Sequence, residues 1–216
     1  RAAAGDLVQA VDADGALLSV RLTTIAPRAA EGVIVARARL ETESPLRLTL
    51  AQAVPKGDKM EGIVRMTTEL GVRRVIPLLT ERTVVRPEPD RWAARLTRWQ
   101  RVAREAAQQS GRAAVPEITP PRALSGWRPD AEADGLLICF WEEEPRGLEG
   151  RLPAGPCSAA TVIVGPEGGL TAAEVGGLID AGALVAGLGP RVLRTETAGA
   201  VAVVLLQARY GDLGRA

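Results

Sequence analysis

The sequence contains no histidine among its 216 residues, and this absence removes several classes of active site. Histidine is the commonest general base and the commonest metal ligand, so proton transfer in this protein must rely on carboxylates or water. A Ser-His-Asp or Cys-His nucleophilic site is excluded. A zinc site would need thiolates or carboxylates alone, and we therefore predict no metal site.

Cysteines and long apolar runs are also scarce. Cys139 and Cys157 are the only cysteines, and they have no Cys-x-x-Cys spacing. Two isolated thiols are typical of buried, reduced cysteines in a cytosolic protein. No apolar run approaches the ~20 residues that span a membrane, and no signal peptide is visible. We therefore expect a cytoplasmic protein without a membrane association.

Charge of neither sign is in excess. The chain has 27 lysines and arginines against 26 aspartates and glutamates, so the net charge of +1 does not by itself indicate a nucleic-acid partner. Hydrophobic residues make up 46% of the chain and charged residues 25%, which is the balance of an ordinary globular protein. The length suits one large domain or two small ones.

The strongest pattern begins with a strand and a glycine loop in the last third of the chain. Residues 161–164 are apolar and β-branched, which is typical of a buried parallel strand. The glycine-rich segment 165–170 ends this run. Thr171 and Glu174 then have the spacing of a capping box, so a helix is expected to begin there.

A second unit of the same kind follows. Residues 183–188 form an apolar run, residues 189–194 form a loop that carries Arg191 and Arg194, and a helix is expected over residues 195–210. Both loops then lie at the carboxyl ends of strands, where ligands bind in open α/β sheets. The sequence therefore predicts a ligand crevice between the two loops.

The glycines of the first loop indicate recognition by the main chain. Gly165, Gly168 and Gly169 surround a glutamate, and glycine allows both a positive φ and the close approach of a ligand to the backbone. Backbone amides suit a polar, flat ligand such as an adenine ring. For one loop alone, an ordinary tight turn is the simpler explanation, but a second loop with two arginines favours a binding site.

The rest of the chain predicts further strands and helices. A hairpin turn at Asp14-Gly15 indicates a small β module at the start. The later order of strand, helix and strand implies a right-handed crossover and a parallel sheet. The expected strands are residues 7–11, 17–22, 33–40, 47–53, 72–79 and 135–141. One expected helix ends at Leu70, and another spans residues 91–110.

The helix expected over residues 91–110 carries a series of arginines. Such a series can follow a phosphate backbone, or it can serve only as a solvated face, and charge patterning alone does not separate the two. The arginines are Arg91, Arg95, Arg98, Arg101 and Arg104.

Two loop sequences resemble the paired signature of the RsmE-type 16S rRNA uridine-N3 methyltransferases, a family of the SPOUT class. They are Gly165-Pro166-Glu167-Gly168-Gly169-Leu170 and Leu188-Gly189-Pro190-Arg191-Val192-Leu193-Arg194-Thr195-Glu196-Thr197-Ala198. The resemblance implies a SPOUT-type α/β fold whose parallel sheet is threaded into a trefoil knot, which composition and periodicity do not suggest. It also implies S-adenosylmethionine as cofactor, N3 of a specific uridine in 16S rRNA of the small ribosomal subunit as substrate, and a homodimer.

The same resemblance divides the chain into two domains. Residues 1–43 look like a PUA-like β domain that is incomplete at its amino terminus, and residues 44–216 look like the methyltransferase domain. The sequence departs from the family at Met66 and Gln108, where lysine and glutamate are usual. A charged group is therefore missing at both positions.

The chemistry of N3 methylation gives roles to two residues of the second loop. The uracil N3 must lose its proton, and the ring oxygens must tolerate negative charge, so a base and a nearby cation would serve. We assign Arg194 to charge stabilisation and Glu196 to orienting the base or accepting its proton, although an acid in the first turn of a helix also stabilises the helix dipole. The residues expected to contact the cofactor are Gly165, Glu167, Gly168, Gly169, Leu188, Gly189, Leu193 and Thr195.

Two arginines outside these loops match family positions that suggest RNA contacts. Arg82 follows Thr80 and Glu81 in a family signature, and an exposed ion pair with Glu81 explains it equally well. Arg112 matches as well, and we expect it near the substrate pocket.

Two rival functions remain open at this stage. Another SPOUT activity, such as ribose 2'-O methylation, would keep the fold and change the acceptor atom. A non-catalytic RNA-binding protein would use the glycine loops to hold only a phosphate, and it would bind no S-adenosylmethionine.

Overall fold

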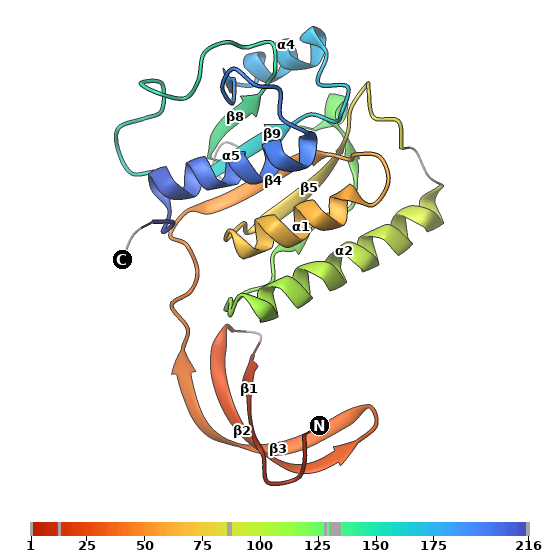
Figure 1. Cartoon of the computed structure of the whole chain (residues 1–216), viewed down its shortest axis with the longest axis vertical. Coiled ribbons are helices and arrows are strands. Elements are labelled where there is room, and N and C mark those ends of the chain that lie inside the picture. Colours follow the sequence, from red (N-terminus) through yellow and green to blue (C-terminus); the bar gives the residue numbers. More distant parts are fainter. Residues whose placement is uncertain (1, 13, 86–87, 128, 130–134, 215–216) are drawn as a thin grey trace. The chain divides into compact units, whose positions relative to one another are not determined.

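The computed structural model describes residues 2–12, 14–85, 88–127, 129 and 135–214 (Figure 1). The chain divides into two compact units. The first unit contains Arg1–Glu43 together with Gly111–Ala114, and the second contains Ser44–Ser110 and Val115–Ala216.

The first unit is built on an antiparallel sheet of three strands. They are β1 (Leu7–Val11), β2 (Ala16–Ala26) and β3 (Ala29–Arg39), in the order β1-β2-β3. The turn between β1 and β2 forms because the Asp12 carboxylate accepts hydrogen bonds from the amides of Asp14 (3.0 Å) and Ala16 (2.9 Å). Among the described hydrophobic residues of this unit only Leu22 is buried, so the sheet has little core of its own.

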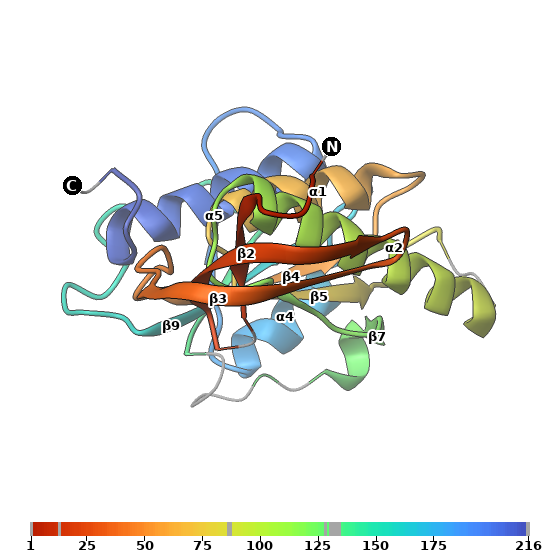
Figure 2. The same ribbon diagram turned by 90° about the horizontal axis from the view of Figure 1, so that it is seen from below.

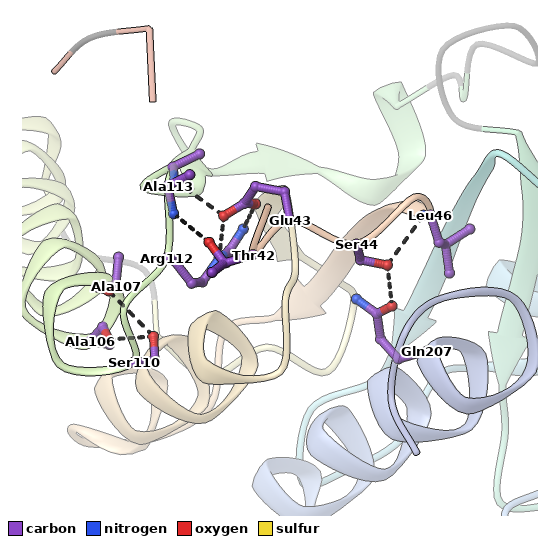
Figure 3. Close-up of polar contacts among 11 residues, drawn as sticks. Thr42, Glu43, Ser44, Leu46, Ala106, Ala107, Ser110, Arg112, Ala113 and Gln207 are labelled. Atoms are coloured by element: carbon purple, nitrogen blue, oxygen red, sulfur yellow. Dashed lines mark hydrogen bonds and ion pairs between the residues drawn. The ribbon is translucent and has the colours of Figure 1, made fainter. Parts of the chain in front are cut away.

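A short segment from the middle of the chain completes this unit. The guanidinium of Arg112 forms an ion pair with Glu43 (Nη2 to Oε2, 2.5 Å), and the amides of Ala113 and Ala114 donate to Thr42 Oγ1 and Glu43 Oε1 (Figure 3). Only 4% of the Arg112 side chain is exposed. The arginine therefore ties residues 111–114 to the end of the first unit.

The second unit contains a seven-stranded sheet in which every pairing is parallel. The strand order is β10-β8-β9-β4-β5-β6, and β7 also pairs with β5. The strands are β4 (Arg47–Ala53), β5 (Arg74–Leu79), β6 (Glu117–Ile118), β7 (Arg122–Ala123), β8 (Leu136–Phe140), β9 (Ala159–Val164) and β10 (Leu184–Ala186).

Helices cover both faces of this sheet. Figure 2 shows β4 and β5 between α1, α2 and α5 on one side and α4 on the other. Alternate residues of each strand supply the two cores: Leu48 and Leu50 of β4 pack toward the first set of helices, whereas Ala51 packs toward α4. The helices are α1 (Lys59–Glu69), α2 (Pro89–Gln109), the single 3-10 turn η1 (Leu124–Gly126), α4 (Ala172–Asp180) and α5 (Thr195–Tyr210).

The last helix returns from the edge of the sheet to its centre. The chain leaves β9, passes through α4 and forms β10 beside β8 at the edge, and α5 then packs against β4 and β9 (Figure 1). The glycine-rich loops over residues 165–170 and 187–194 connect these elements. None of the described helices has the length and apolar character that a membrane crossing requires.

The predicted α/β class with a parallel sheet is confirmed. The helix over residues 195–210 begins and ends where the sequence predicts, and Thr171 and Glu174 form the predicted capping box. The prediction was wrong about the start of the third strand, which begins at Ala29, and it missed the two-residue strands β6 and β7. Such short strands have no periodicity to read, because tertiary pairing with β5 alone defines them.

Candidate functional site

A cavity of about 420 Å³ lies at the carboxyl ends of β8, β9 and β10. Three loops that follow these strands form most of its wall. Lys59, the first residue of the helix α1 that follows β4, also lines it. The volume falls within the range of small-molecule sites. Its lining residues are Lys59, Phe140, Trp141, Glu142, Val164, Gly165, Pro166, Glu167, Gly169, Gly187, Leu188, Gly189, Pro190, Arg191, Val192, Leu193, Arg194, Thr195 and Ala198.

The first loop turns tightly because Gly169 adopts a left-handed conformation. Its φ is +70°, and its amide donates to the carbonyl of Pro166 (2.9 Å). A Cβ at this position would collide with the carboxyl group of Glu142. The loop is therefore packed against the segment that follows β8, and only glycine fits at this position.

Contacts from the turn after β5 hold this loop in place. The Glu174 carboxylate accepts from the amide of Thr171 (2.9 Å) in the capping box and from the amide of Glu81 (2.8 Å). Arg82 Nη1 donates to the carbonyl of Gly168 (2.7 Å). Within the described part of the chain Arg82 forms no ion pair with Glu81, so its first contact is with the glycine loop.

The second loop approaches the backbone of the segment after β8. The amide of Gly187 donates to the carbonyl of Arg146 (2.8 Å), and a Cβ at Gly187 would collide with the carbonyl oxygen of Glu144. Gly189 has a φ of +102°. Arg194 is the N-cap residue of α5 and is exposed at the cavity wall, where it makes no ion pair with any described residue.

A lysine links the two carboxylates of the site. Lys59 Nζ lies 2.9 Å from Glu167 Oε1 and 3.5 Å from Glu196 Oε2. The hydrogen bond to Glu167 raises the pKa of Lys59, so the amine stays protonated. Burial raises the pKa of Glu167, but the hydrogen bonds from Lys59 and from the backbone, including the amide of Lys56, outweigh it and leave the pKa lowered.

Glu196 lies just behind the cavity wall, in the first turn of α5. Its Oε2 is buried and, among the described residues, has only the long ion pair with Lys59 and no hydrogen bond. Its place at the helix start fits a contribution to the helix dipole. Its buried, incompletely satisfied oxygen also fits a proton acceptor.

The structure brings most of the predicted cofactor residues together. Gly168 and Glu196 do not line the cavity but adjoin residues that do, and Arg82 reaches the site through Gly168. Arg112 belongs to the other unit, in its ion pair with Glu43. The predicted residues that line one cavity are Gly165, Glu167, Gly169, Leu188, Gly189, Leu193, Arg194 and Thr195.

Sequence reasoning gave no site role to Lys59, and the residues from Phe140 to Glu142 entered only through the family resemblance, which places the end of the expected strand 135–141 at the cofactor. All of them line the cavity. A signal existed, since ligands bind at the carboxyl ends of parallel strands: Phe140 and Trp141 end one expected strand, and Lys59 follows the turn after the strand expected over residues 47–53.

Glu144 supports the back of the second loop through a bidentate ion pair. Arg146 Nε and Nη2 donate to its two oxygens at 2.7 and 2.8 Å. These hydrogen bonds, followed by that from the Arg146 amide, lower the pKa of Glu144 to about 2. Because the folded-state pKa is lowered, the stabilisation is fully present above the ordinary carboxyl pKa and is lost as the pH falls toward 2.

We therefore expect Glu144→Gln to lower the melting temperature at pH 7 and to have a smaller effect at pH 3. Calorimetric melting curves at both pH values measure the difference. Glu143→Gln is the matched control, because Glu143 is exposed and forms no ion pair with any described residue, and it should show no such change with pH. An equal loss at both pH values for Glu144→Gln would show that the ion pair is not the source of the stabilisation.

Comparison with known proteins agrees with this geometry. The RNA methyltransferase domain family matches residues 42–207. "Ribosomal RNA small subunit methyltransferase E" of Bacillus subtilis is 32% identical over 202 residues, which are 90% of this chain and 78% of that protein. The protein of the same name from Synechocystis is 34% identical over 207 residues, 94% of this chain and 66% of its own length.

A solved structure extends the agreement to the fold. The crystal structure of a ribosomal RNA small subunit methyltransferase E from Neisseria gonorrhoeae, bound to S-adenosyl methionine, has a TM-score of 0.83 and 33% identity. The match covers 98% of this chain and 86% of that one. This chain therefore belongs to the RNA methyltransferase domain family, among the relatives of ribosomal RNA small subunit methyltransferase E.

Proposed function

We propose that this protein is an S-adenosylmethionine-dependent methyltransferase that methylates N3 of a specific uridine in 16S rRNA of the small ribosomal subunit. The observation that carries the proposal is the glycine-lined cavity at the ends of β8, β9 and β10. Relatives that share this fold carry the name of the small-subunit enzyme, and one of them holds S-adenosyl methionine.

The residues of the cavity fit this cofactor. Gly165 and Gly169 both line the cavity, and side chains at Gly169 and Gly187 would collide with Glu142 and Glu144. Main-chain amides and carbonyls suit an adenine edge. The cofactor contacts that we propose are Gly165, Glu167, Gly168, Gly169, Leu188, Gly189, Leu193 and Thr195. Gly168 does not line the cavity itself but lies between Glu167 and Gly169, which do.

The reaction needs little from the protein beyond position and charge. The bound cofactor supplies a methyl group that its sulfonium already activates. Arg194 is exposed at the cavity wall and donates to the uracil oxygens, which gain negative charge as N3 loses its proton. Glu196 orients the base or accepts that proton, and Lys59 holds its carboxylate in place.

RNA contacts and the domain arrangement complete the proposal. Arg82 is exposed beside the first loop and is an RNA contact in this account. Arg112 acts indirectly on RNA binding, because its guanidinium is engaged with Glu43. The first unit corresponds to a PUA-like domain, which we place over residues 1–43. The path from β9 to α5 is the SPOUT trefoil knot in this proposal, and a crystal structure of this protein would test it.

We also propose a homodimer that acts on ribosomes in the cytoplasm. α5 is apolar almost all round, yet Leu205 is 41% exposed and Val201 and Val204 are half-buried in the single chain. A second copy would cover them. Sedimentation velocity is expected to show a dimer that Leu205→Glu dissociates. A monomeric wild-type protein would contradict this part of the proposal.

Methyl transfer from labelled S-adenosylmethionine to unmodified small subunits tests the activity. Mass spectrometry of the digested nucleosides is expected to identify 3-methyluridine. A ribose-methylated nucleoside would keep the fold and overturn the acceptor atom. Absence of transfer, together with absence of cofactor binding in calorimetry, would favour a non-catalytic RNA-binding protein.

A further inference from the structure

Gln52, in the central strand β4, is a buried polar side chain whose register partners in the neighbouring strands, Pro77 and Val164, are apolar. Gln52 of β4 is fully buried. Its Nε2 donates to Thr195 Oγ1 (2.9 Å) and to the carbonyl of Ala53 (3.1 Å), and Thr195 Oγ1 in turn donates to the carbonyl of Gly165 (2.6 Å). This chain of hydrogen bonds joins the central strand to the start of α5 and to the first glycine loop.

The amide of Gln52 carries a cost that an apolar residue would avoid. Its Oε1 is buried and has no hydrogen-bond partner among the described residues. It points at Gly199 of α5, where a Cβ would lie 2.7 Å from this oxygen. An unsatisfied buried carbonyl destabilises the folded state. Leucine occupies two other positions of the same strand, Leu48 and Leu50, so stability alone does not explain the glutamine.

We propose that Gln52 is a positioning residue for the cofactor site. Through Thr195 it fixes the distance between the two loops that form the cavity, so that the backbone of Gly165 and the first turn of α5 are already in the binding geometry. The inference rests on the proposed function, since it assigns the cavity to S-adenosylmethionine. It adds a residue that touches no ligand and lines no part of the cavity.

The chain contains a matched control at the other end of α5. Gln207 is also fully buried, and it also has one amide atom, Nε2, without a hydrogen-bond partner among the described residues. Its Oε1 accepts from Ser44 Oγ at 2.7 Å (Figure 3). Neither Gln207 nor Ser44 lines the cavity. The two glutamines therefore differ in their connection to the site and not in burial.

The test replaces each glutamine by methionine, which has a similar shape and no amide. Calorimetric titration with S-adenosylmethionine measures the Kd, and melting curves without cofactor measure stability. For Gln52→Met we expect a Kd about tenfold weaker, or ~1.4 kcal/mol, with a melting temperature within about 4 °C of the wild type. Gln207→Met should show a similar change in melting temperature and a Kd within about twofold of the wild type.

A second route covers the case in which Gln52→Met does not fold. Thr195→Val keeps Gln52 and removes the hydroxyl through which it acts, so it should weaken the Kd by about tenfold as well. Where both variants fold, the double variant should bind S-adenosylmethionine about as well as the weaker-binding single variant, because both substitutions act through one network.

Several results would overturn the inference. They are an unchanged Kd in Gln52→Met or in Thr195→Val, an equal loss of affinity in Gln207→Met, or fully additive effects in the double variant. A wild-type protein that binds no cofactor would instead overturn the proposed function, and this inference with it. The wild-type titration therefore separates the two failures.

Discussion

Replacement of Arg194 by alanine is expected to lower kcat for methyl transfer by about 100- to 1000-fold, the loss seen when one preorganised donor to a developing oxyanion is removed. Arg194 is held by its place as N-cap of α5, and its guanidinium is exposed at the cavity wall without an ion pair to any described residue. It is therefore available to the uracil oxygens. Single-turnover transfer to small subunits at saturating cofactor measures the effect.

Arg194→Lys is the matched variant for this prediction. Lysine keeps the positive charge but loses the planar fork of donors, so activity should lie between the wild type and Arg194→Ala. Cofactor affinity should change little in either variant, because the role is on the acceptor. A kcat within threefold of the wild type in Arg194→Ala would show that charge stabilisation comes from another group.

Replacement of Gly187 by alanine is expected to weaken cofactor binding by about 10- to 100-fold. Gly187 lines the cavity, and overpacking at this position destabilises the binding geometry by about 1–3 kcal/mol. The new Cβ would collide with the carbonyl oxygen of Glu144, and backbone cannot swing aside as a flexible side chain does. The second loop must shift away from the segment after β8. Calorimetric titration and melting curves measure the loss of affinity and a lower melting temperature.

Gly177→Ala controls for the effect of removing a glycine. Gly177 lies in α4, is exposed, and has open space where a Cβ would be. Alanine in a helix is more favourable than glycine by about 0.5–1 kcal/mol, so this variant should melt slightly higher and bind the cofactor normally. Normal affinity in Gly187→Ala would mean that the second loop is not part of the cofactor site.

Local rules explain why much of the fold was predictable. The capping box at Thr171 and Glu174, the glycine loops and the apolar run of α5 are each set by residues near in sequence. The same rules place the two loops at one edge of the sheet, since parallel strands present their carboxyl ends together. Eight of the residues assigned to the site from the sequence line one cavity for this reason.

Residues whose roles depend on distant partners were not predictable in this way. Gln52 reads as part of an apolar strand, and only the return of α5 reveals its bond to Thr195, which is 143 positions away in the sequence. Lys59 gains its role from Glu167 of the first loop and Glu196 of α5. Arg112 matched a family position, but its ion pair with Glu43 arises from contacts that no local pattern records.

Mapping of methylation on 16S rRNA in cells tests directly whether this protein methylates N3 of a uridine there. A methyl group on N3 blocks the pairing edge of uracil, so reverse transcriptase stops at the modified nucleotide, whereas a ribose methyl leaves that edge open. In a bacterial strain that lacks its own small-subunit methyltransferase E, this protein should restore one such stop, and Arg194→Ala should not. If the wild-type protein is stably produced and binds the cofactor, but reverse transcriptase still reads through without a stop, N3 methylation of 16S rRNA by this site is contradicted.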